Sequence, residues 1–307
     1  SKQEESSGPL AAHRYAQVLS ALDWDKENYS RTGTPPAARS VPNVVPVPPL
    51  VGHVSQATAR RVQQFLTTGL CTLPEGLKKD QVQAGRDAIL DYFHKVNFTI
   101  NQLDLQEVLV DKGFSTFKLR HPGRYDMVVP DLASPRFDFF HEDAPWLPLV
   151  RAVLGPDAVQ VHSGCILSLP GSHAQSWHSD GDHLDVWTQV PAHCLNVFVP
   201  LVDMDARVGP TEFTPETHLQ WSARPGNVTL TANAGQAILF DYRLRHRGLA
   251  NKSDTPRPLI YVTYAKPFFR DQDNFSRARY QDLPELVAPT SRNGGAGAGG
   301  RRRREGG

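Results

Sequence analysis

The second half of the chain consists of short segments in which apolar and polar residues alternate, and this pattern constrains the fold more than any other feature. Gly, Pro, Asn and Asp separate the segments, and no long helical pattern intervenes. The alternating segments lie at 158–169, 195–202, 227–232, 235–242 and 258–265. A parallel sheet with helical crossovers is therefore disfavoured, and the pattern predicts an antiparallel barrel or a two-sheet jelly roll.

Helical periodicity is confined to the residues before this region. The predicted helices span 55–67, 79–96 and 143–153, and a short strand at 70–73 separates the first two. Ser55 and Asp143 are the expected N-caps, and Gly69 and Gly155 the expected stops. The chain is thus predicted to be mainly β with flanking helices, an α+β arrangement in which the helices come first.

The two ends of the chain differ from this body in composition. Residues 1–50 are polar and then proline-punctuated, which predicts an extended or disordered arm with one short helix at 13–22. Residues 286–307 contain a Gly/Ala run followed by Arg301–Arg304, which is typical of a disordered tail. One domain is expected over 51–285, with its β core at about 158–269.

Composition excludes several classes of protein. The net charge of +1 gives no broad attraction to nucleic acid, apart from the arginines of the tail, and no apolar run is long enough to span a membrane. The three cysteines are odd in number and widely spaced, which disfavours disulfides and a CxxC zinc site. This favours an intracellular, cytoplasmic protein, although a leader removed before Ser1 would not show in this numbering. Oligomeric state is left open.

Candidate metal ligands occur within the β region. Three His-x-Asp pairs are present, at His141/Asp143, His178/Asp180 and His183/Asp185. The first is set aside because Asp143 is interpreted as a helix cap, and the third lies in a polar stretch. The second follows a predicted strand, where residues two apart share a face.

A second histidine and an arginine complete the pattern. His246 follows the alternating segment 235–242, and Arg257 comes eleven residues later. Two histidines and a carboxylate are the ligands of a non-haem Fe(II) site that leaves three positions open. The planar fork of an arginine binds a carboxylate through two parallel hydrogen bonds, so Arg257 suits the far end of a dicarboxylic keto acid.

Several blocks in a fixed order carry a resemblance to a known family. They are WHSDG (177–181), NVFVPLVD (196–203), GPTEFTPETH (209–218), GQAILFD (235–241), HRGLANKSD (246–254) and RPL (257–259), with FLTTGLCTLPEGL (65–77) ahead of them. Together they resemble the phytanoyl-CoA dioxygenase family of Fe(II)/2-oxoglutarate-dependent oxygenases. The resemblance covers most of the body and excludes the arm and the tail.

The resemblance implies a double-stranded β-helix (jelly roll, cupin-like) core. It makes His178, Asp180 and His246 the iron ligands and Arg257 the partner of the distal carboxylate of 2-oxoglutarate. The implied reaction consumes O2 and 2-oxoglutarate, releases succinate and CO2, and hydroxylates an unactivated C–H of a small organic molecule such as a lipid, amino acid or natural product. Desaturation or cyclisation is left open, and the carboxylate of Asp180 argues against halogenation.

Two positions depart from the family pattern. Members often carry Gly where Glu216 stands, which predicts a changed loop near the mouth of the site. Many also have a hydroxyl residue at the position of Leu259. A second contact to the distal carboxylate must then come from elsewhere in the chain or be absent.

Further site candidates rest on weaker patterns. Gln175 is placed where it could contact the cosubstrate, although a surface turn residue is the favoured interpretation. Asn196 could also point at the cosubstrate, although a strand end that faces solvent explains it equally well. Trp177, Trp187 and Phe198 could wall a substrate pocket, although aromatic residues on strands are more often plain core. Arg120 and Arg124 lie in a predicted polar loop, where surface ion pairing is favoured, and Arg124 is kept as a candidate for the substrate pocket.

Three alternative functions remain. A prolyl-hydroxylase-like oxygenase acting on protein would usually hold 2-oxoglutarate with a lysine, where this chain has Arg257. A catalytically silent jelly-roll binding module would use the histidines as ordinary polar core. A nucleic-acid-associated protein would depend on Arg301–Arg304.

Overall fold

The computed structural model describes residues 55–74, 76–185, 187–220, 226–271 and 280–287. The predicted arm, its short helix at 13–22 and the Arg301–Arg304 run lie outside the described residues.

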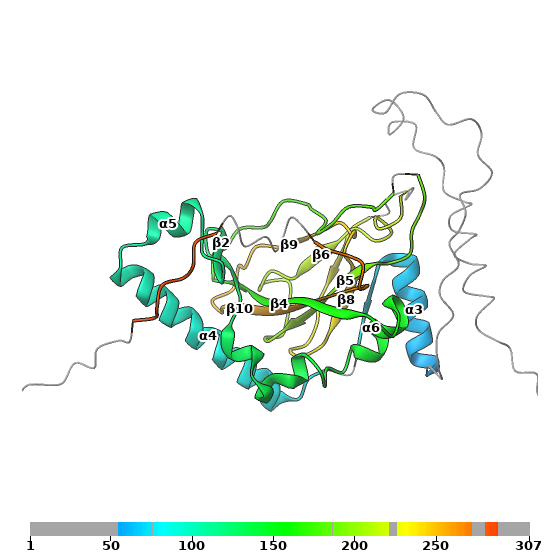
Figure 1. Ribbon diagram of the computed structural model, residues 1–307, viewed down its shortest axis with the longest axis horizontal. Coiled ribbons are helices and arrows are strands. Elements are labelled where there is room, and N and C mark those ends of the chain that lie inside the picture. The colour runs from blue at the N-terminus through cyan, green and yellow to red at the C-terminus, as the bar shows by residue number, and fades with distance from the viewer. Residues whose placement is uncertain (1–54, 75, 186, 221–225, 272–279, 288–307) are drawn as a thin grey trace, which may run out of the picture.

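Two antiparallel sheets form the centre of the molecule (Figure 1). The large sheet has the order β1-β8-β5-β10-β4-β3-β2, and the small sheet has the order β7-β6-β9. The strands of the large sheet are β1 (Leu70–Thr72), β2 (Phe117–His121), β3 (Arg124–Met127), β4 (Val159–Ser168), β5 (Cys194–Pro200), β8 (Ile238–Asp241) and β10 (Arg257–Ala265). Those of the small sheet are β6 (Thr211–Phe213), β7 (Val228–Leu230) and β9 (His246–Gly248). The predicted β region and its antiparallel pairing are confirmed.

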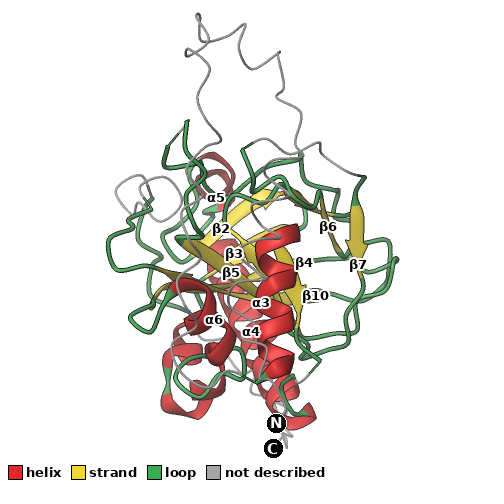
Figure 2. Cartoon of the chain, turned by 90° about the vertical axis from the view of Figure 1, so that its right-hand side faces the viewer, coloured by secondary structure: helices red, strands yellow, loops and turns green. Residues whose placement is uncertain are grey.

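Helices cover the outer face of the large sheet, and Figure 2 shows α3, α4 and α6 gathered on that side. They are α3 (Gln56–Thr68), α4 (Lys79–Gln102), α5 (Gln106–Asp111) and α6 (Leu147–Leu154), with the 3-10 helices η1 (Pro130–Ala133) and η2 (Pro135–Phe140) before α6. Ser55 caps α3 as predicted, because its hydroxyl accepts a hydrogen bond from the Thr58 N–H at 3.1 Å. Gly69 ends this helix with a φ of 83°, a conformation that glycine adopts without steric cost.

The predicted start of the third helix is wrong. Helix α6 begins at Leu147 after Trp146, and Asp143 instead lies in a turn where its N–H bonds the carbonyl of Asp138 at 2.9 Å. Pro148 occupies the first turn of α6, where its missing N–H costs nothing. Asp143 is therefore not a helix cap.

Alternation along the strands separates the core into two layers. Val197 and Val199 of β5 belong to the cluster that packs against α4 through Ile89 and Phe93. The intervening Phe198 faces the small sheet, where a second cluster contains Phe213 and Phe240 among others. Because successive side chains point to opposite faces of a strand, every second residue of β5, β10 and β4 lines the space between the sheets.

The segment 117–127 differs from its prediction as a polar loop. It forms the β2–β3 hairpin, and β3 pairs with β4 along the register Arg124–Ser168 to Met127–Cys165. The hairpin extends the large sheet, so the alternate residues Arg124 and Asp126 point into the space between the sheets. Both are buried.

All three cysteines, Cys71, Cys165 and Cys194, are buried and unbridged, as their number and spacing predicted. Within the part of the chain that the structure describes, no helix combines the length and the apolar character needed to cross a membrane.

Candidate active site

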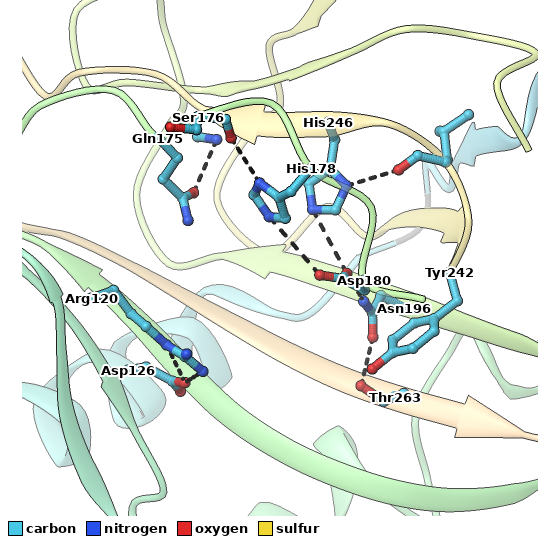
Figure 3. A network of polar contacts seen from close by, with 12 residues as sticks. Arg120, Asp126, Gln175, Ser176, His178, Asp180, Asn196, Tyr242, His246 and Thr263 are labelled. Atoms are coloured by element: carbon cyan, nitrogen blue, oxygen red, sulfur yellow. Dashed lines mark hydrogen bonds and ion pairs between the residues drawn. The ribbon is translucent and has the colours of Figure 1, made fainter. Parts of the chain in front are cut away.

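Two distant segments bring three potential metal ligands together. An isolated bridge pairs His178 with His246 of β9, and the N–H of each donates to the carbonyl of the other at 3.0 and 2.8 Å. Two residues after His178, the N–H of Asp180 donates to the carbonyl of Tyr242 at 3.0 Å. The backbone therefore fixes all three side chains on the same side of this bridge (Figure 3).

The ligand atoms of His178, Asp180 and His246 all lie within 4.8 Å of one another. The Nε2 atoms of His178 and His246 are 3.9 and 3.7 Å from the carboxylate oxygens of Asp180. This spacing is too long for hydrogen bonds, and it leaves the three groups facing a common point. Among the described residues, this is the only such cluster.

The other nitrogen of each ring is held by a backbone carbonyl. Nδ1 of His178 lies 2.8 Å from the carbonyl of Ser176, and Nδ1 of His246 lies 2.9 Å from that of Leu244. When each Nδ1 carries the proton, the lone pair of Nε2 points at the cluster, which is the arrangement that a metal-ligating histidine needs. Burial lowers the pKa of His246, although Asp180 opposes this shift, so burial favours the neutral ring that can bind a metal.

Asp180 is oriented by a chain of two hydrogen bonds. Nδ2 of Asn196 donates to its carboxylate at 2.6 Å, and the hydroxyl of Thr263 donates to Oδ1 of Asn196 at 2.5 Å (Figure 3). Asn196 and Thr263 are cross-strand partners on β5 and β10. One carboxylate and two imidazoles with these supports fit a non-haem Fe(II) ion, which takes nitrogen and oxygen ligands.

The cluster borders a cavity of about 420 Å³, a volume typical of small-molecule sites. Its walls include polar side chains from β3, β5 and β10 and the apolar residues Ile166, Phe198 and Leu259. Asp126 lies in this wall, where it accepts hydrogen bonds from Tyr261 at 2.8 Å and from Arg120 at 3.0 Å. Figure 3 shows the pair of Arg120 and Asp126 across from the histidines.

Arg257 begins β10 and lies in the same cavity, buried to 1% exposure. Its NH2 group donates to the hydroxyl of Ser168 at 2.7 Å, but Nε and NH1 have no hydrogen-bond partner. Burial and the positive charge of Arg124 lower the pKa of Arg257 to about 9. A buried cation with unmet donors fits an anionic ligand such as a carboxylate.

The remaining predicted residues divide between the cavity and the surface. Gln175 and Phe198 line the cavity, and Oε1 of Gln175 accepts the N–H of Gly248 at 3.0 Å. Trp177 and Trp187 are not part of the cavity wall: the guanidinium of Arg247 lies 4.6 Å from the ring centroid of Trp177, and Trp187 is 44% exposed.

The structure corrects the expectation that Arg124 lies in a polar surface loop. Surface ion pairing was the favoured expectation, but Arg124 is 1% exposed and lines the cavity. Ser168 and Thr263 were not identified from the sequence at all. Their alternation with apolar neighbours on β4 and β10 places them on the inner face, and that signal could have found them.

The competing His-x-Asp pairs lie elsewhere. His141 bonds the carbonyl of Leu132 through Nε2, and Asp185 accepts N–H groups of its own turn. Neither pair forms a three-residue ligand cluster among the described residues.

A jelly roll with two histidines, a carboxylate and a buried arginine around one cavity defines a class, the non-haem oxygenases that use a keto acid. The model of the phytanoyl-CoA dioxygenase (PhyH) family matches residues 65–259, well over half of the chain. The chain therefore belongs to this family of Fe(II)- and 2-oxoglutarate-dependent oxygenases. The predicted family and fold class are thereby confirmed.

Individual relatives are more distant. The dioxygenase af480 of Aspergillus fumigatus is 27% identical over 184 residues, which cover 52% of this chain and 58% of that protein. The crystal structure of EctD from S. alaskensis with 2-oxoglutarate and 5-hydroxyectoine has a TM-score of 0.55 at 20% identity and covers 80% of this chain and 92% of its own. The epimerase SnoN with Fe3+, α-ketoglutarate and nogalamycin RO has a TM-score of 0.51 at 19% identity and covers 77% and 93%. These two structures are similar in fold.

Proposed function

We propose that this chain is an Fe(II)- and 2-oxoglutarate-dependent dioxygenase that hydroxylates an unactivated C–H of a small organic molecule. The observation that carries this proposal is the convergence of His178, Asp180 and His246 at the edge of a cavity that also contains the unpaired donors of Arg257. When bound, iron and 2-oxoglutarate supply the oxidising chemistry, in which O2 is consumed, succinate and CO2 are released and one oxygen atom enters the substrate.

The protein supplies ligand geometry and cosubstrate orientation. His178 and His246 present Nε2 because Nδ1 of each ring is held by a carbonyl. Asn196 holds Asp180 in one orientation, and it also lines the cavity, where the predicted contact with the cosubstrate would be made. Arg257 would bind the distal carboxylate of the keto acid, and Phe198 and Leu259 would exclude water beside it.

The cavity favours a small molecule over a protein as substrate, because its volume of about 420 Å³ must accommodate both the keto acid and the substrate. The same inference is in line with EctD and SnoN, each solved with a small organic molecule. Product analysis distinguishes hydroxylation from desaturation and cyclisation. The distinction is needed because SnoK, whose crystal structure has a similar fold, is a carbocyclase.

The proposal is tested by adding Fe(II) and 2-oxoglutarate to the protein without oxygen and then admitting oxygen. A weak visible absorption band should form under anaerobic conditions, and succinate should then appear only with both metal and oxygen. Asp180→Ala serves as the matched variant and should give neither signal. If the wild-type protein gives no band and no metal-dependent succinate, the chain is a binding module with a jelly-roll fold.

A further inference from the structure

Two buried arginines flank one serine on the inner face of the large sheet. Arg257 of β10 and Arg124 of β3 are both cross-strand partners of Ser168 on β4, the strand that lies between them. Cross-strand partners point to the same face of a sheet. Both arginines line the cavity, and each is 1% exposed.

Neither guanidinium has a counter-ion among the described residues. Arg124 donates through NH2 to the carbonyls of His173 and Leu249, at 3.1 and 2.8 Å, and its Nε has no partner. Burial lowers the pKa of Arg124 to about 10. Arg120, in the same cavity, differs because Asp126 neutralises it. Two like charges buried side by side without a carboxylate partner from the protein are unfavourable, so this arrangement is suited to binding a negatively charged group.

The position of Arg124 depends on the missing side chain of Gly248. A Cβ at Gly248 would lie 2.6 Å from NH1 of Arg124 and 2.7 Å from Oε1 of Gln175. Gly248 is two residues beyond His246 on β9, which is about 7 Å along a strand. That span is comparable with the length of a five-carbon dicarboxylate whose other end is bound beside His246.

We propose that Arg124, together with Arg257, binds the distal carboxylate of 2-oxoglutarate. This carboxylate would lie between the two guanidinium groups. The hydroxyl of Ser168 accepts from Arg257 at 2.7 Å, so its hydrogen is available to donate to the same carboxylate. Ser168 and Arg124 thus replace the hydroxyl contact that Leu259 cannot make. This inference rests on the proposed function and assigns residues to its cosubstrate.

The test is calorimetric titration of the full chain with Fe(II) under anaerobic conditions, so that no turnover is needed. The ligands are 2-oxoglutarate and 2-oxopentanoate, which has the same five carbons and lacks the distal carboxylate. Arg124→Met should weaken 2-oxoglutarate binding by about tenfold or more, because a charge-assisted contact is lost. Its affinity for 2-oxopentanoate should stay within about threefold of the wild type, since that ligand makes no such contact.

Gly248→Ala provides a second variant that keeps the charge of Arg124 and displaces its guanidinium. It should also weaken 2-oxoglutarate binding more than 2-oxopentanoate binding. Arg247→Met is the matched control. Arg247 is on β9 next to Gly248, but it pairs with Glu212 at 2.8 Å and is not part of the cavity wall. Its affinities should equal those of the wild type.

The possible outcomes distinguish a failure of the role proposed for Arg124 from a failure of the proposed function. If wild-type protein binds no 2-oxoglutarate, the proposed function itself fails. If the wild type binds 2-oxoglutarate and both Arg124→Met and Gly248→Ala bind it equally well, the role of Arg124 is refuted. Equal losses of affinity for 2-oxoglutarate and 2-oxopentanoate would also refute the role of Arg124, because they would indicate general damage to the cavity.

Discussion

At the scale of single residues, Arg257 has the clearest measurable role. It is fully buried, and two of its three guanidinium nitrogens, Nε and NH1, have no hydrogen-bond partner. Arg257→Ala should therefore raise the KM for 2-oxoglutarate by about 30-fold or more, because truncating one member of a buried charge pair costs about 2–5 kcal/mol. Steady-state kinetics with varied 2-oxoglutarate measures this change. An unchanged KM would mean that another group holds the cosubstrate.

The ion pair between Asp241 and Arg243 has a structural role. Burial alone would raise the pKa of Asp241, but two hydrogen bonds from Arg243, both of 2.8 Å, outweigh burial and hold it at about 2. Arg243→Met should destabilise the fold by about 3–5 kcal/mol in urea unfolding, because it leaves a buried charge unpaired. The double variant that adds Asp241→Asn should recover part of that loss. A single variant as stable as the wild type would contradict this account.

Sequence patterns could predict His178, Asp180 and His246 as candidate metal ligands and Arg257 as a candidate carboxylate-binding residue. Each of them lies in a short block with its own signature. Arg124 could not be assigned in this way. Charged residues on a short segment are usually exposed, and here the inner face of β3 is polar because it lines a cavity. The usual alternation of apolar-in and polar-out is therefore reversed at Arg124 and Asp126, and the segment resembled a loop.

At the scale of elements, the loop after β6 contains one strained backbone position, Glu216. Glu216 has a φ of 67°, the left-handed region in which a Cβ is unfavourable. The loop is fixed there because the N–H of Glu216 donates to the carbonyl of Thr68 at 2.9 Å. A glycine at this position would adopt the same conformation without this strain.

Glu216→Gly should therefore increase the free energy of unfolding by up to about 1 kcal/mol, because relief of strain exceeds the added freedom of the unfolded chain. Urea denaturation measures this difference. Glu216→Ala is the control, since it removes the carboxylate and keeps the Cβ, and it should give no gain. Equal stabilisation by Ala and Gly would show that the carboxylate, and not the backbone, is unfavourable.

Element types were more predictable than element boundaries. The N-cap at Ser55 and the stop at Gly69 were confirmed because a cap and a left-handed glycine are local features. Helix α4 continues to Gln102, past the predicted end at 96, because Thr99 and Ile100 are buried and packing prolongs the helix. Long-range contacts of this kind leave no local signal.

At the scale of the whole molecule, buried histidines should make the protein sensitive to acid. Burial lowers the pKa of His218 to about 4, and His183 and His193 behave in the same way. Between pH 6.5 and 4 the unfolded chain binds more protons than the folded one, so stability falls as the pH falls through this range. Well above pH 6.5, where these histidines are neutral in both states, they contribute no pH dependence.

For His218 alone, the free energy of unfolding should fall by about 2 kcal/mol between pH 7 and pH 5. Urea unfolding of His218→Asn at the two pH values should show a smaller difference than the wild type by this amount. His94→Asn, which changes an exposed histidine on α4, should retain the wild-type difference. An undiminished loss in His218→Asn would mean that other groups cause the acid sensitivity.

We propose that two segments of the chain bring His178, Asp180 and His246 around one ferrous ion, and metal binding tests this proposal most directly. Equilibrium dialysis against Fe(II) without oxygen should give one ion per wild-type chain. Binding should be lost in His178→Ala, Asp180→Ala and His246→Ala, and should be retained in His183→Ala. Loss of iron in His183→Ala together with its retention in His178→Ala would contradict the assignment and transfer it to the competing pair.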